Sequence, residues 1–218
     1  MSPVENTNYR GRGRPPTRPD AETRHLIAET ARREFLARGY AGTCMDDVAK
    51  GAGVSKKTLY RLVPAKADLF KASVTDRIAR FLDAADEEAI AALDVDAALE
   101  RYLTEFGDLT LSNDTIALLR LAIAESERFP ELAASFYADA VLATQGVLAR
   151  FLARQCELGV LELDDPVAAA GMLRGMMMME PQRAAMLAGV ELPTPAQIRD
   201  RARQCIRLFL RGCRARDP

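Results

Sequence analysis

Apolar and polar residues follow a helical spacing along almost the whole chain. After residue 19 the apolar side chains recur every three or four positions, as in Ile27, Ala31 and Phe35, and no sustained alternation of period two competes with them. Glycines and prolines fall between the apolar runs. The pattern predicts an all-α fold of about nine helices, four beginning near Asp20, Thr43, Ser55 and Lys66 and five at about 94–111, 113–128, 130–158, 164–187 and 194–211.

Polar residues at the predicted helix starts suggest how these helices are capped. Asp20, Thr43 and Ser55 are residue types that accept hydrogen bonds from the free N–H groups of a first turn. Asp46, three residues after Thr43, completes the pattern of a capping box. Gly39 is expected to end the first helix, because glycine readily adopts the left-handed conformation found after helix C-termini.

Residues 43–66 follow the plan of a helix-turn-helix, which is two short helices joined by a tight turn. Gly53 lies in the turn, where a permissive backbone is needed. The second helix has an apolar face formed by Leu59, Leu62 and Val63. Its opposite face carries cationic and aromatic side chains at the same spacing, namely Lys57, Tyr60 and Arg61.

The polar face of this second helix matches the chemistry of a DNA major groove. Such a helix enters the groove with its N-terminal residues leading, and these include Lys56 and Thr58. Lysine and arginine reach phosphates or guanine edges, and a tyrosine hydroxyl suits a phosphate oxygen. Lys66, at the start of the next helix, adds a cation beside free N–H groups that can bind phosphate. These residues are the predicted contacts with double-stranded DNA.

The same stretch resembles the DNA-binding domain of the TetR/AcrR family of bacterial repressors, over about residues 22–80. The resemblance implies that Thr43, Tyr60 and Lys66 bind phosphate and that Lys56, Lys57, Thr58 and Arg61 face the groove. It rests on three runs: Val48-Ala49-Lys50-Gly51-Ala52-Gly53-Val54-Ser55, Thr58-Leu59-Tyr60 and Pro64-Ala65-Lys66-Ala67-Asp68-Leu69-Phe70.

Three positions depart from the usual family pattern. Leu62 stands where the family often has an aromatic residue or histidine able to touch phosphate, and Val63 stands where phenylalanine is common. Lys57 stands where many members have glycine or another small residue. The added charge could shift base preference, so no operator sequence is inferred.

Charge distribution supports a division of the chain. The formal net charge is −1, but residues 1–80 hold 16 Lys and Arg against 9 Asp and Glu, a net of +7, whereas residues 81–218 hold 14 against 22, a net of −8. A cationic half suggests a polyanionic partner, although a mostly acidic surface elsewhere would produce the same split. We expect a flexible basic arm at 1–19, a DNA-binding domain at 20–80 and a regulatory domain for effector binding and dimerisation at 81–218.

The arm contains a second candidate DNA contact. Its run Arg10-Gly11-Arg12-Gly13-Arg14-Pro15-Pro16 resembles the core of an AT-hook, whose arginines enter a narrow minor groove. Arg12 and Arg14 are the predicted contacts. The alternative is a solvated basic tail that adds only salt-dependent affinity.

Apolar residues of the C-terminal part could line an effector cavity. Ordinary helical core is the alternative for each of them, because core stripes and pocket walls share one periodicity. Met176–Met179 point around the whole helix, which suits a promiscuous pocket or a subunit interface. The candidates are Phe106, Leu109, Leu119, Ile123, Phe136, Tyr137, Met172, Met176 and Met177.

The predicted last helix has a continuous apolar stripe that needs a partner. The family resemblance implies that helices 164–187 and 194–211 pair with their copies in a homodimer. Such a dimer presents two recognition helices to half-sites about one turn apart, and hence to a pseudo-palindromic operator. The stripe comprises Ile198, Ala202, Cys205, Ile206, Phe209 and Leu210.

Composition argues against several other classes of protein. A single histidine, the lack of a glycine-rich phosphate loop and the lack of spaced metal ligands make an enzyme, a metal site or a cofactor unexpected. No signal peptide is recognisable, and no apolar run approaches the roughly 18 residues of a membrane span. The four separated cysteines are expected to be reduced thiols. A cytoplasmic location without a membrane partner is expected.

Together these features favour a transcriptional repressor that a small, apolar effector releases from its operator. The alternative is a DNA-associated architectural or adaptor protein on the same fold, without an effector. A filled core without a pocket would favour that alternative.

Overall fold

The computed structural model describes residues 18–84 and 93–213, which form helices joined by short connections. Elements α8, η1 and α9 form one continuous helix, so the described residues contain nine helices. The predicted all-α fold is confirmed. The elements are α1 Asp20–Gly42, α2 Met45–Gly51, α3 Lys56–Leu62, α4 Lys66–Ala84, α6 Val95–Thr110, α7 Asn113–Ala124, α8 Pro130–Phe136, η1 Tyr137–Leu142, α9 Ala143–Glu157, α10 Pro166–Ala188 and α11 Pro195–Cys213.

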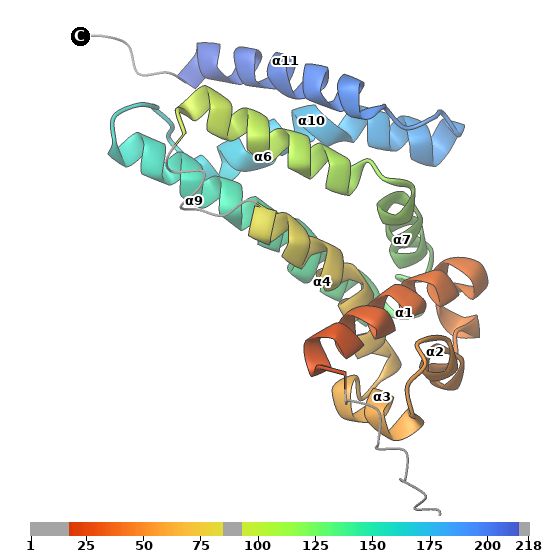
Figure 1. Cartoon of the computed structure of the whole chain (residues 1–218). Helices are drawn as coiled ribbons and strands as arrows, with labels where there is room; N and C mark the ends of the chain where they lie inside the picture. Colours follow the sequence, from red (N-terminus) through yellow and green to blue (C-terminus); the bar gives the residue numbers. More distant parts are fainter. Residues whose placement is uncertain (1–17, 85–92, 214–218) are drawn as a thin grey trace, which may run out of the picture.

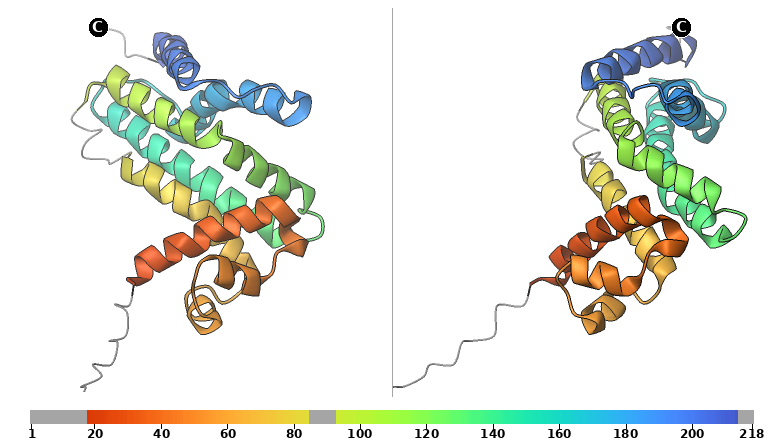
Figure 2. Two further views of the ribbon diagram at one scale, coloured as in Figure 1. Left: turned by 45° about the vertical axis from the view of Figure 1, so that its right-hand side comes forward. Right: turned by 90° about the vertical axis from the view of Figure 1, so that its right-hand side faces the viewer.

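The helices form a small N-terminal head and a larger C-terminal body (Figure 1). Helices α1, α2 and α3 make up the head, and α10 and α11 lie at the opposite end of the molecule (Figure 2). Helix α4 leads from the head into the body and packs against α1 on one side and against α6 and α8 on the other. The predicted domain boundary near residue 80 therefore falls inside α4.

The head and the body share one hydrophobic core. It contains α1 and α4 together with Leu118 and Leu132 of the body. Aromatic rings join the two parts, because Tyr40 lies 4.8 Å from Phe129 and 6.2 Å from Phe70, measured between ring centroids. The head is thus held to the body through buried side chains and not only through the chain connection.

A second core fills the far end of the body between α6, α9, α10 and α11. The apolar stripe of α11, for which the sequence predicted a partner, is buried here against α6 of the same chain, and of its six residues only Phe209 is partly exposed. Gly107 makes this packing possible. A Cβ at that position would lie 2.6 Å from Met177 Cε and 2.7 Å from Ile198 Cγ2.

Two of the predicted helix caps are wrong. Ser55 caps α3 as expected, since its Oγ accepts a hydrogen bond from the Thr58 amide. Thr43 does not cap α2, because its hydroxyl donates to the Gly39 carbonyl, and Cys44 occupies the N-cap position. Asp20 likewise lies within the first turn of α1 and not at its N-cap. Each side chain has another partner, which for Thr43 is the carbonyl four residues earlier and for Asp20 is Arg61, 41 positions away.

Gly39 marks a kink and not the end of the first helix. Its φ of 70° breaks the helical conformation, and the chain then continues in one more turn to Gly42. The left-handed conformation expected of this glycine is therefore present, but it redirects the chain towards α2.

By length and composition, Pro130–Glu157 could cross a membrane, contrary to the expectation drawn from uninterrupted apolar runs. Length and apolar composition are also features of core helices. Leu148 and Leu152 of this segment are fully buried in the second core, and Asp139 forms an ion pair with Lys71 of α4. The segment is therefore a helix of the folded body.

Phe35 provides a test of the shared core. Phe35→Ala should lower the free energy of unfolding by about 3–5 kcal/mol, because it leaves a cavity at a side chain that is 1% exposed. Chemical denaturation followed by circular dichroism measures this change. Leu36→Ala is the matched control. The Leu36 side chain is 37% exposed, so its truncation should lower the free energy of unfolding by less than about 1 kcal/mol. Similar losses for both variants would contradict the assigned core.

Candidate DNA-binding surface and effector cavity

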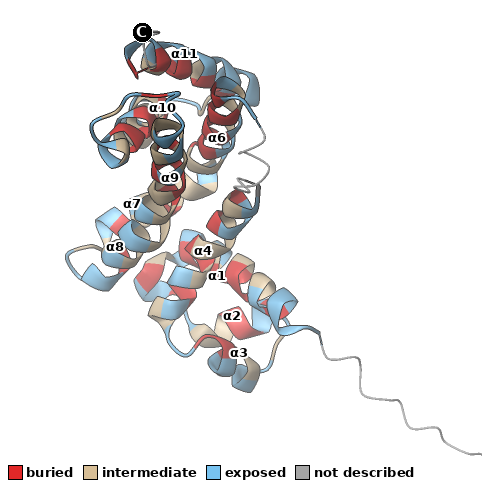
Figure 3. Cartoon of the chain, turned by 90° about the vertical axis from the view of Figure 1, so that its left-hand side faces the viewer, coloured by how far each residue is buried: buried red, intermediate tan, exposed pale blue. Residues whose placement is uncertain are grey.

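Helix α3 presents one buried face and one exposed face. Leu59 and Leu62 are buried in the head, which fixes the rotation of this short helix. Lys57 and Arg61 are exposed on the other side, and Tyr60 is 48% exposed. Figure 3 shows that α3 carries both buried and exposed residues. The spacing predicted from sequence therefore produces a solvent-facing cluster of two cations and one phenol.

The N-terminal part of α1 is hydrogen-bonded to α3 through two arginines. The Arg61 guanidinium donates two hydrogen bonds to the Asp20 carboxylate, at 2.8 and 2.7 Å. These hydrogen bonds lower the pKa of Asp20 and raise that of Arg61. Arg24 of α1 also donates to the Leu62 carbonyl at the end of α3, at 2.7 Å. Two arginines thus connect α3 to α1, while the buried Leu59 and Leu62 hold the helix in place.

An acidic residue also holds Lys56. Its ammonium group forms a hydrogen-bonded ion pair with Asp46 of α2, and this contact raises the pKa of Lys56. Lys57 differs, because its side chain has no ion pair or hydrogen bond within residues 18–84 and 93–213. Of the cations on α3, Lys57 is therefore the one available without breaking an existing contact.

The remaining residues predicted to contact DNA differ in their exposure and in their hydrogen-bond partners. Thr43 is 3% exposed and its hydroxyl is used inside the head. The Thr58 hydroxyl shares a hydrogen bond with Ser55 Oγ at 2.8 Å. Lys66 Nζ donates to the Ala41 carbonyl at 3.1 Å and lies 4.9 Å from the centroid of the Tyr40 ring. Arg12 and Arg14 lie outside the described residues.

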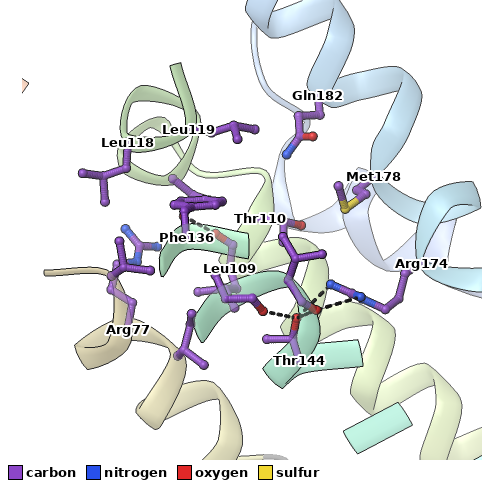
Figure 4. Close-up of a pocket in the computed structure, with 15 residues that line it drawn as sticks. Arg77, Leu109, Thr110, Leu118, Leu119, Phe136, Thr144, Arg174, Met178 and Gln182 are labelled. Carbon is purple, nitrogen blue, oxygen red and sulfur yellow. Dashed lines mark hydrogen bonds between the residues drawn. The ribbon is translucent and has the colours of Figure 1, made fainter. Parts of the chain in front are cut away.

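A cavity of about 180 Å³ lies in the body next to the C-terminal half of α4 (Figure 4). Helices α4, α6, α7, α8, η1, α9 and α10 all contribute side chains to its walls. The π-helical turn of η1 contributes Ala140 and Val141, and such turns are frequent at functional sites. Most of the wall is apolar, with Arg77, Thr144, Arg174 and Gln182 among its polar groups.

Three of the nine predicted cavity residues line this space, namely Leu109, Leu119 and Phe136 (Figure 4). Phe106 and Met177 are instead fully buried core residues, and Met176 packs against the same core.

The other three predicted residues, Ile123, Tyr137 and Met172, are exposed on the surface at 55, 57 and 69%. Helical periodicity identifies apolar positions but does not tell a cavity wall from a packed core or from an uncovered face.

Sequence reasoning missed the polar residues of the cavity. Arg174 gave one usable signal, because it interrupts the most apolar stretch of the chain. Its guanidinium donates to Thr144 Oγ1 at 2.8 Å and to the Val141 carbonyl at 3.2 Å, and it lies 4.5 Å from the centroid of the Phe106 ring. Burial lowers the pKa of Arg174.

Comparison with known proteins gives the class to which this architecture belongs. Residues 27–73 match the family described as bacterial regulatory proteins of the tetR family, and residues 97–213 match the AefR-like transcriptional repressor C-terminal domain. The second match spans more than half of the chain. The chain therefore belongs to the TetR family of transcriptional regulators.

Individual relatives agree with this assignment. The regulator EthR of Mycolicibacterium smegmatis is 30% identical over 103 residues, which are 44% of this chain and 47% of the relative, so the match spans about half of EthR. A TetR-family structure from Mesorhizobium loti has a TM-score of 0.77 at 25% identity, over 91% of this chain and 99% of that one. The flavonoid-responsive regulator FrrA has a TM-score of 0.70 at 29% identity, over 90% and 100%.

Membership in this family makes the protein a transcriptional regulator and not an enzyme. In the part of the chain that the structure describes, no three His, Cys, Asp or Glu side chains lie close enough together to hold a metal ion.

The Asp20–Arg61 pair leads to a prediction about DNA affinity. Asp20→Asn should raise affinity for a DNA duplex about fivefold at low salt, because it frees Arg61 and removes a negative charge close to the phosphates of the DNA. Fluorescence anisotropy with a labelled duplex measures the change. Glu157→Gln is the control, because this exposed carboxylate pairs with Arg154 in the body. An equal gain in both variants would contradict a role specific to Arg61.

Proposed function

We propose that this protein is a cytoplasmic, homodimeric repressor that binds a pseudo-palindromic DNA operator and leaves it when a small, mainly apolar effector occupies the cavity. The observation that carries the proposal is the exposed face of α3, where Lys57, Tyr60 and Arg61 lie together while the opposite face is buried. A helix of this kind fits the major groove of B-DNA.

Each predicted DNA-contact residue has a proposed role. Lys57 and Arg61 contact the groove, and Lys56 and Thr58 lie at the leading end of the helix. Tyr60 and Lys66 bind phosphate oxygens. Lys56 and Arg61 exchange their carboxylate partners for DNA, which costs little because both ion pairs are exposed. Thr43 supports the surface through its backbone and its buried hydroxyl, and Arg12 and Arg14 add contacts from the arm.

The proposed dimer forms through the outward faces of α10 and α11. Met172 and Met179 of α10 are 69 and 42% exposed, and Leu208 of α11 is 63% exposed. A Cβ at Gly175, between these methionines, would meet no atom of another described residue within 4 Å, so the backbone of α10 is open to close approach by another helix. Methionine adapts to a partner surface, and an apolar face of this kind is typical of a subunit interface.

The position of the cavity supports control by an effector. Val74, Arg77 and Ile78 of α4 line it, and the same helix is packed into the head. A ligand that fits one orientation of α4 better than another shifts the population of head positions by its difference in affinity. The cavity also favours a regulator over the architectural alternative, for which a filled core was expected.

Relatives provide context for the effector. FrrA is described as flavonoid-responsive, which is a property of that protein. By analogy we include aromatic compounds among the effectors of this chain.

Tyr60→Ala tests the DNA-binding assignment. Operator duplexes are first selected from random DNA with the full-length protein. The variant should then bind them at least tenfold more weakly, because hydrogen bonds to charged groups contribute roughly 1.5–3 kcal/mol. Its melting temperature should stay nearly unchanged, since Tyr60 is 48% exposed. Equal affinity of wild type and variant would reject the assignment.

Met172→Glu tests the proposed interface. A charged side chain on an apolar contact should shift the protein from dimer to monomer in sedimentation velocity at micromolar concentration. Leu158→Glu is the matched control, because Leu158 is also exposed, at 56%, but lies at the end of α9. A dimer that is unchanged by Met172→Glu would place the interface elsewhere.

A further inference from the structure

We propose that the effector carries an anionic headgroup, a carboxylate on a small aromatic or aliphatic body, and that Arg174 binds this group from the wall of the cavity. The inference rests on the proposed effector site and specifies the chemistry of its ligand.

Arg174 is a buried cation without an acidic counter-ion. Its side chain belongs to a residue that is 6% exposed, and no carboxylate within residues 18–84 and 93–213 lies within ion-pair distance of it. Arg77, the other arginine of the cavity, differs because it forms an ion pair with Asp114 at 3.2 Å. Arg174 is therefore the uncompensated charge of this wall.

Neutral acceptors satisfy only part of the Arg174 guanidinium. Nη1 and Nη2 donate to Val141, Gln145 and Thr144, whereas the buried Nε has no hydrogen-bond partner among the residues that the structure describes. A buried charge that lacks a counter-ion costs free energy, and an anion placed beside it recovers much of that cost. A planar guanidinium is also the side chain best suited to a carboxylate, which it can bind through two parallel hydrogen bonds.

The rest of the cavity suits an apolar ligand body. Leu109, Leu118, Leu119 and Phe136 line the side away from the guanidinium (Figure 4). Its volume of about 180 Å³ is slightly larger than an engineered cavity of roughly 150 Å³ that holds benzene. One substituted ring or a short alkyl chain fits this space, with the acidic group at Arg174.

Gln182 offers a second polar contact on the same helix. Its amide is buried at 8% exposure, and no described residue is hydrogen-bonded to it. Because Gln182 follows Arg174 by roughly 12 Å along α10, it lies towards the other end of the ligand body. A hydroxyl or ether oxygen at that end would meet it.

The test compares acids with their neutral amides on the full-length protein. The probes are 3-phenylpropanoate and octanoate, each set against its primary amide, with binding measured by calorimetry at pH 7.5. We expect each acid to bind at least tenfold more tightly than its amide, and only the acids to release the protein from its selected operator at micromolar concentration.

Variants assign the preference to Arg174. Arg174→Met should remove the preference for acids and leave the melting temperature of the free protein equal or higher, because an uncompensated buried charge is lost. Arg174→Lys keeps the charge and should retain part of the preference. Arg183→Met is the matched control, since Arg183 is an exposed arginine of the same helix, and it should preserve the full preference. Leu119→Trp should block acids and amides alike.

Several outcomes would overturn the inference. Equal binding of acids and amides by the wild type would reject an anionic headgroup while leaving an apolar effector in place. Acid preference that persists in Arg174→Met would reject Arg174 as its origin. Failure of all four probes to bind would reject the ligand class, whereas loss of the proposed function is judged separately, from the effect of Tyr60→Ala on operator affinity.

Discussion

Helix α4 packs into both hydrophobic cores at once, and the relation between the DNA-binding surface and the cavity depends on this packing. Phe70 and Val74 belong to the core that the head shares with the body, whereas Phe81 belongs to the second core at the far end of the body. Packed interiors resist continuous deformation, so a displacement at one end of such a helix moves the groups at its other end. The Tyr40–Phe129 contact adds a second buried connection between the two parts.

The candidate DNA-binding surface and the cavity differ in the burial and ion pairing of their cationic side chains. On the head, Arg61 and Lys56 are exposed and paired with Asp20 and Asp46. Exposed ion pairs contribute little stability and are easily exchanged for phosphate contacts. In the body, Arg174 is buried, and it has no acidic partner among residues 18–84 and 93–213. The head is therefore suited to a polyanion that displaces weak internal pairs, and the cavity to a small ligand that supplies a missing charge.

Family membership defines the scaffold but not the ligand. Similarity to the M. loti structure and to FrrA extends over about nine-tenths of this chain at 25 to 29% identity. One fold of this kind can hold unrelated ligands, because specificity depends on a few side chains in the cavity. The proposed ligand chemistry of this protein therefore depends on its own cavity residues, chiefly Arg174.

The sequence by itself determined the helices, the helix-turn-helix and the two faces of α3. These features depend on the spacing of neighbouring residues, and Leu59 and Tyr60 occupy opposite faces because of helical periodicity alone. Polar residues with distant partners were predicted less well. Asp20 was expected to cap a helix, but it binds Arg61, which lies 41 positions away.

Only the tertiary structure decided where the cavity lies and what covers the last helix. Seven elements supply the cavity walls, so Leu109 lines it while Phe106, one turn earlier on α6, is core. The stripe of α11 packs against α6 of the same chain, whereas Met172 of α10 and Leu208 on another face of α11 are exposed. A hydrophobic pattern predicts which side chains are buried. The residues that cover each of these side chains depend on how segments far apart in the sequence pack together.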